Sequence, residues 1–195
     1  MGVEPHKNMR KAWILGLVLL GAGILIARGD IIPTLSSVTG SSPTFTWNYT
    51  ANVTVDETIN TGDFFTIYDF GAIAPGSNMQ PTGWTFSQAL LGPTPALVNA
   101  TDNPSILNLT WTYNGAAPIS GSAVLGIFSV ITSTDQLKVG QFSAEATRSS
   151  GPNAGTKVDN IGAINVPVPE PSALLPLVGV CAAAVFSTLL RRQRA

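Results

Sequence analysis

The sequence predicts an all-β protein: a single antiparallel β-sandwich, Ig-like or jelly-roll, flanked by an N-terminal signal helix and a C-terminal transmembrane helix. Three observations predict it. Apolar and polar residues alternate with a period of two through the middle of the chain, glycine and proline interrupt that pattern often, and an uncharged run lies near each end. Of the 195 residues, segments 1–29 and 167–195 resemble addressing segments. The remaining domain, 30–166, is long enough for one buried core.

The clearest predicted strand is FTWNYTANVTV, residues 45–55. Every second side chain is apolar, so one face of this strand is expected to be buried. The residues predicted to point inward are Phe45, Trp47, Tyr49, Ala51, Val53 and Val55. Segment 106–114 repeats the pattern, with Leu107, Leu109, Trp111 and Tyr113 inward and Asn108, Thr110 and Thr112 outward.

Five further segments combine β-branched or aromatic residues with flanking turn residues. They are 63–70, 83–90, 122–132, 136–146 and 160–166. Segments 63–70 and 122–132 have the most apolar centres, so they are expected to be the central strands. Gly126 and Gly140 are candidate positions for β-bulges. No part of the middle sustains the apolar period of an amphipathic helix.

The middle of the chain is acidic. Between residues 30 and 168 there are nine Asp and Glu residues but only three cations, Lys138, Arg148 and Lys157, which gives a net charge of −6. A nucleic-acid partner is therefore not expected, because such affinity depends on cations that meet phosphates. The sole histidine, His6, and the sole cysteine, Cys181, lie in the end segments. The middle therefore has no disulfide, no His or Cys zinc ligand and no Ser-His or Cys-His pair. We expect no enzyme and no cofactor.

The N-terminal segment has the layout of a secretory signal peptide. Basic residues Lys7, Arg10 and Lys11 precede an uncharged run of sixteen residues, 12–27. Small residues follow, which predicts cleavage between Gly29 and Asp30. Because Arg28 is unusual in a cleavage region, an uncleaved N-terminal anchor is the alternative. Either interpretation places the middle of the chain outside the inner membrane.

The C-terminal segment predicts a membrane span. Residues 172–190 carry no charge. At a rise of about 1.5 Å per residue, a helix of their seventeen most apolar positions would be roughly 26 Å long, slightly short of a hydrocarbon layer of about 30 Å. The cluster Arg191, Arg192 and Arg194 follows directly and is expected to remain cytoplasmic. A buried core helix is the alternative, but such helices do not usually end in an arginine cluster.

The same end of the chain resembles the PEP-CTERM sorting signal of exported Gram-negative proteins. The resemblance consists of Val168, Pro169, Glu170 and Pro171, then the uncharged run and the terminal arginines. Similar tails are also called ice-binding protein C-terminal domains, a label that implies nothing about ice. The resemblance implies that an exosortase, a membrane-embedded transpeptidase-like enzyme, recognises Pro-Glu-Pro and removes the tail. It also implies transient anchoring in the inner membrane, followed by release to the outer surface or the extracellular matrix, where a structural or adhesive role is expected.

Two ligand-binding alternatives remain open, which would make the protein a secreted carbohydrate- or calcium-binding module. Asp56, Glu57, Asp63 and Asp69 supply oxygen ligands suited to calcium, although their spacing is not that of an EF-hand loop. Trp84 lies beside a turn and could stack on a sugar, including an extracellular polysaccharide, whereas Trp47 and Trp111 are expected in the core. Glycoside hydrolysis would need two paired carboxylates, and no two acids pair uniquely in the sequence.

Overall fold

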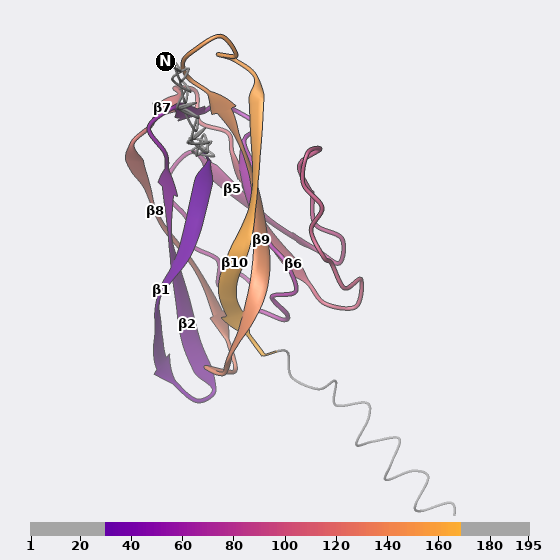
Figure 1. Ribbon diagram of the computed structural model, residues 1–195. Coiled ribbons are helices and arrows are strands. Elements are labelled where there is room, and N and C mark those ends of the chain that lie inside the picture. Colours follow the sequence, from indigo (N-terminus) through magenta and orange to yellow (C-terminus); the bar gives the residue numbers. More distant parts are fainter. Residues whose placement is uncertain (1–29, 169–195) are drawn as a thin grey trace, which may run out of the picture.

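The computed structural model describes residues 30–168, and these form an all-β unit. Its strands make two antiparallel sheets, an arrangement consistent with the predicted β-sandwich (Figure 1). No helix occurs within the described range. The predicted signal helix and transmembrane helix lie outside the described residues.

The smaller sheet has the strand order β1 (Ile31–Ser41), β2 (Thr44–Val53) and β8 (Ala123–Thr132). Strand β2 confirms the clearest sequence prediction, because its alternate residues Trp47, Tyr49, Ala51 and Val53 are buried. The inward placement of Val55 is wrong, since this side chain is 68% exposed. The strand ends at Val53, and the chain then turns before the next strand begins.

The larger sheet has seven strands in the order β5-β6-β4-β9-β3-β7, with β10 on β9. Their bounds are β3 (Glu57–Ile59), β4 (Phe64–Ile67), β5 (Trp84–Ala89), β6 (Asn108–Tyr113), β7 (Ile119–Ser120), β9 (Leu137–Arg148) and β10 (Lys157–Pro167). Strand β9 is long enough to pair with β3 and β4 and also, along nearly its whole length, with β10. It therefore lies between the next strand of the chain and two strands that are distant in the sequence.

The prediction of central strands is half right. Strand β4 lies between β6 and β9 and is central. Strand β8 is at the edge of the smaller sheet and among the described strands pairs only with β2. The apolar sequence of β8 suggested a strand buried on both faces. Phe128 and Val130 on one face are buried, but the apolar side chains of Val124 and Ile127 are exposed.

The core between the sheets is built largely from aromatic rings. Phe128 of β8 meets Phe65, Trp84 and Trp111 of the larger sheet at centroid distances of 5.0, 5.1 and 5.7 Å. All three contacts are edge-on, which is a favoured aromatic geometry. Trp47 and Trp111 are fully buried, as predicted. The aromatic residues of distant strands thus join the two sheets.

The outer face of the larger sheet is covered by the loop 90–107 between β5 and β6. The hydroxyl groups of Thr66 and Tyr68 donate to the carbonyl oxygen of Pro93 in this loop. Asn108 and Thr110 were predicted to face outward, yet they are buried because the loop folds over them. Thr110 contacts Thr66 through its hydroxyl, and the Asn108 amide donates to a carboxylate of the loop.

Three strands were not predicted. Strands β3 and β7 have only three and two residues, too few for a period to be visible. Strand β1 contains proline, glycine and three serines, and it lies at a sheet edge, where such residues are tolerated. The bulge expected at Gly126 is confirmed by a register shift between β2 and β8. Gly140 is paired in unbroken register; instead, a Cβ there would lie 2.8 Å from Val166, so glycine permits close packing.

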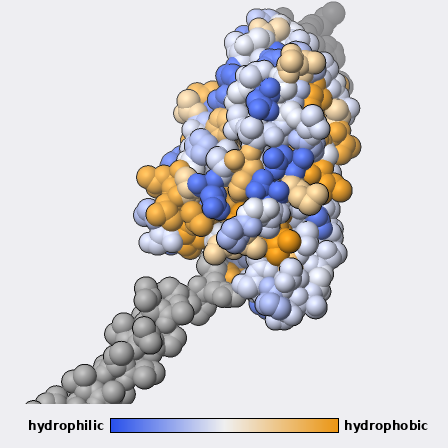
Figure 2. Space-filling model, turned by 180° about the vertical axis from the view of Figure 1, so that it is seen from behind, coloured by the Kyte–Doolittle hydropathy of each residue, from blue (hydrophilic) through white to orange (hydrophobic). Residues whose placement is uncertain are grey.

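Apolar side chains also reach the surface. From behind, polar and apolar residues are intermixed, and apolar residues lie at both sides of this face (Figure 2). The exposed large apolar residues include Leu90, Leu91 and Leu97 of the covering loop.

Candidate functional site at the acidic end

Four acidic residues are buried at one end of the sandwich: Asp30, Glu57, Asp63 and Asp159. Together with the partly buried Glu145, we call them the acidic end. A carboxylate withdrawn from water is destabilising unless it is paired or hydrogen-bonded. The acidic end is therefore where the structure departs most from an ordinary apolar interior.

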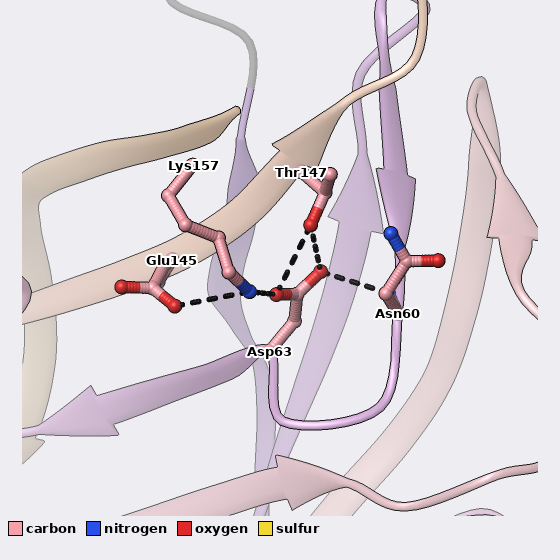
Figure 3. A network of polar contacts seen from close by, with 5 residues as sticks. All are labelled: Asn60, Asp63, Glu145, Thr147 and Lys157. Carbon is pink, nitrogen blue, oxygen red and sulfur yellow. Dashed lines mark hydrogen bonds and ion pairs between the residues drawn. The ribbon is translucent and has the colours of Figure 1, made fainter. Parts of the chain in front are cut away.

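Asp63 is fully buried and fully partnered (Figure 3). It closes the turn between β3 and β4, where its backbone amide donates to the carbonyl of Asn60. Its Oδ2 atom accepts hydrogen bonds from the Asn60 amide at 2.8 Å and from the Thr147 hydroxyl at 3.1 Å. The turn and strand β9 thus hold one carboxyl oxygen with two neutral donors.

The other oxygen, Oδ1, contacts the ammonium group of Lys157. Lys157 begins β10 and lies directly opposite Thr147 of β9 in the antiparallel register. Its side chain therefore passes over β9 to reach the turn on the far side. A second carboxylate, Glu145, lies 3.1 Å from the same nitrogen. One cation is thus held between two acids from different segments.

The charge state of Lys157 follows from this placement. Burial lowers its pKa, but hydrogen bonds and charge attraction from Asp63 and Glu145 outweigh that effect, so the pKa is raised above its ordinary value. Lys157 is therefore held as an ammonium ion.

Asp30 and Glu57 lack such partners. Asp30 Oδ1 accepts from the Ile31 amide at 2.7 Å, whereas its Oδ2 and both oxygens of Glu57 have no hydrogen-bond partner. Burial raises the pKa of Asp30 to about 9, and repulsion from Glu57, Asp159 and Asp63 adds to this. Burial also raises the pKa of Glu57, against the attraction of Arg148. Asp30 is therefore neutral at pH 7.

The four residues considered for calcium are not brought together. Asp63 is paired with Lys157, Glu57 has a separate buried position, and Asp56 is exposed. Asp69 accepts a hydrogen bond from the Asn103 amide in the covering loop. Within residues 30–168, no three His, Cys, Asp or Glu side chains are grouped so that they could hold a metal ion.

The sugar platform expected at Trp84 is wrong. This side chain is only 5% exposed and packs edge-on against Phe65, Tyr113 and Phe128. The turn before β5 directs Trp84 inward, because β5 pairs with β6 and presents this residue to the core. It is therefore unable to stack on a ligand in solution.

The sorting residues lie at and beyond the edge of the described range. Val168 follows β10 directly, and its amide donates to the Gln136 carbonyl at 2.8 Å. Asp30 of the predicted cleavage site is buried at the start of β1. Gly29, Pro169, Glu170, Pro171, Arg191, Arg192 and Arg194 lie outside the described residues. No helix that is long and apolar enough to cross a membrane was found in 30–168.

The polar network around Lys157 was not identified from the sequence. Asp63 was noted only as a calcium ligand, and Glu145, Thr147 and Lys157 were not assigned a role. One signal was available, since Lys157 is one of only three cations among nine acids. The register that places it across β9 from Asp63, 94 positions away in the chain, could not be read from local patterns. No family model and no curated protein matches this chain.

Proposed function

We propose that the protein is an exported structural or adhesive protein of the cell surface or extracellular matrix, sorted through a PEP-CTERM tail. The observation that carries the proposal is the ordered set Pro169-Glu170-Pro171, uncharged run and arginine cluster at the end of the sequence. On this proposal an exosortase-type transpeptidase is the processing partner, the inner membrane holds the precursor through its signal and transmembrane helices, and the domain is an Ig-like or jelly-roll sandwich.

The form of the folded unit supports a non-catalytic role. Its interior is filled with aromatic rings. Among its buried carboxyls, Asp63 is held in an ion pair, while Asp30 and Glu57 have oxygens without a hydrogen-bond partner. The final strand ends at Pro167, immediately before the sorting motif. Prolines on both sides of Glu170 keep that segment extended, which suits a processing enzyme that must grip the chain.

The test is fractionation of cells that express the wild type or Glu170→Gln, with mass analysis of the chain ends. We expect wild-type protein outside the inner membrane, without Arg194, and the variant retained in that membrane. A matched control is Asp56→Asn, which removes an exposed carboxylate far from the motif in the sequence and should be released normally. Release of Glu170→Gln at the wild-type level would contradict the proposal, as would a mature wild-type chain that retains Arg194.

A further inference from the structure

We infer that Lys157 and Asp63 are joined by an intramolecular amide bond, with Glu145 as the proton carrier. The Lys157 amine contacts Oδ1 of a fully buried carboxyl group. An amine held against a carboxyl group has the two partners of a condensation reaction in contact. Held reactants behave as if at effective concentrations of about 10⁵ M or more, which can offset the unfavourable balance of amide formation in water.

The second carboxylate distinguishes this site from a simple ion pair. Glu145 Oε1 lies 3.1 Å from the Lys157 nitrogen, within reach for proton transfer. It projects from β9, the strand that separates the two reacting residues, and it is only partly buried, with a side chain 20% exposed. It can therefore accept a proton from the amine and return it to the departing oxygen.

The two oxygens of Asp63 have different environments, and each suits a different role. Oδ2 is held by the Asn60 amide and the Thr147 hydroxyl. These donors would stabilise negative charge on that oxygen in a tetrahedral intermediate, as in an oxyanion hole. Oδ1 contacts the amine and is the oxygen that leaves. The contacts of the two oxygens thus assign one to developing charge and the other to departure.

The reaction balances without any added reagent. A proton passes from the Lys157 ammonium to the Asp63 carboxylate, which gives a neutral amine and a carboxylic acid. The amine electron pair then attacks Cγ of Asp63 and forms the C–N bond. Glu145 removes a proton from the nitrogen and delivers it to the Oδ1 hydroxyl, the C–O bond breaks, and one water molecule leaves. Lys157 lines a surface cavity of about 330 Å³, which gives the water a route out.

Such a bond would be a covalent cross-link, as a disulfide is, in a domain that has no disulfide. Residues 30–168 contain no cysteine, so they can be covalently closed only by other side chains. The link would span 94 positions of the sequence and tie the last strand to the turn between β3 and β4, across β9. It would therefore restrict the unfolded chain over most of the domain.

The test is peptide mapping by mass spectrometry of the full-length protein. We expect a branched peptide that contains both Asp63 and Lys157 and is lighter by one water than its two parts, together with resistance to trypsin after Lys157. Unlinked peptides and normal tryptic cleavage at Lys157 in the wild type would overturn the inference. Peptide mapping is done on the wild-type protein, so misfolding of a variant cannot affect the result.

Variants then assign the roles. Lys157→Arg keeps the positive charge but should abolish the link, whereas Lys138→Arg, the matched control on β9, should leave it intact. Glu145→Gln should form the link roughly a hundredfold more slowly, since proton transfer contributes about that factor or more; an unchanged rate would overturn the role of Glu145. The outcome is separate from sorting, because a linked domain could fail to be released and an unlinked one could be released normally.

Discussion

The middle of the sandwich and its acidic end are both buried, but they are stabilised by different means. In the middle, aromatic rings from both sheets contact each other edge-on and need few polar partners. At the acidic end, carboxyl groups are removed from water, and each depends on what its neighbours supply. Burial alone therefore stabilises the middle, whereas at the end the same burial is favourable only where a partner is present.

The acidic end contains both a buried carboxyl group with partners and one that lacks them. Asp63 has two neutral donors and a cation, so its charge is accommodated. Asp30 has one backbone donor and an unpartnered second oxygen, and it remains protonated near neutral pH. Lys157, one of three cations in residues 30–168, contacts the two acids Asp63 and Glu145 at once.

The largest expected effect is in the middle. Trp84→Ala should lower the free energy of unfolding by about 3–5 kcal/mol, because it removes a buried ring that the neighbouring side chains cannot replace. Urea unfolding measured at pH 5 and pH 9 should give the same loss at both values. Leu97→Ala, at a position that is 81% exposed, is the control and should change stability by less than about 0.5 kcal/mol. A small loss at Trp84 would mean that the core repacks.

The next effect is at the acidic end and depends on pH. The pKa of Asp30 is raised from 3.8 to about 9, so between these values the folded protein holds a proton that the unfolded chain has released. Stability from this group is complete below about pH 4 and is lost as the pH rises toward 9. Asp30→Asn should therefore remove much of this decline and be more stable than wild type at pH 9 by at least about 1.4 kcal/mol, the equivalent of one pKa unit.

The measurement is urea unfolding from pH 4 to pH 9, on the chain with residue 29 still attached so that no new ammonium group lies beside Asp30. The exposed Asp135 provides the control, and Asp135→Asn should keep the wild-type pH profile. Parallel profiles for wild type and Asp30→Asn would show that the buried carboxyl is charged and compensated.

The smallest effect is expected at Glu57. Glu57→Gln should also flatten the decline of stability with rising pH, because burial raises the pKa of this carboxyl. The change should be smaller than that of Asp30→Asn, since Arg148 opposes the shift. Asp56→Asn, the exposed neighbour, is the matched control. Equal pH profiles of stability for Glu57→Gln and its control Asp56→Asn would mean that the Glu57 carboxyl group reaches water despite its burial.

The sequence predicted the fold well where side chains alternate. In β2 and β6 the apolar period identified Trp47 and Trp111 as core residues, because period two is a direct consequence of strand geometry. The sequence pattern gave wrong orientations where burial depends on contacts between segments that are not neighbours in the sequence. The loop 90–107 buries Asn108 and Thr110, and the inward turn of Trp84 depends on pairing with β6. At the acidic end, Lys157 and Asp63 are 94 positions apart in the sequence, so no local pattern could reveal their pairing.

The path of the chain through the sandwich has a mechanical consequence. The described chain enters with β1 at one end, and β10 runs to the opposite end, where the described residues stop (Figure 1). A pull on the chain beyond Pro167 would act along β10 and load its hydrogen bonds with β9 together, in shear, rather than opening them one by one. Lys157 is the far end of this strand and is fastened to Asp63. Under the proposed C-terminal anchoring, such a force would therefore reach the Lys157–Asp63 contact last.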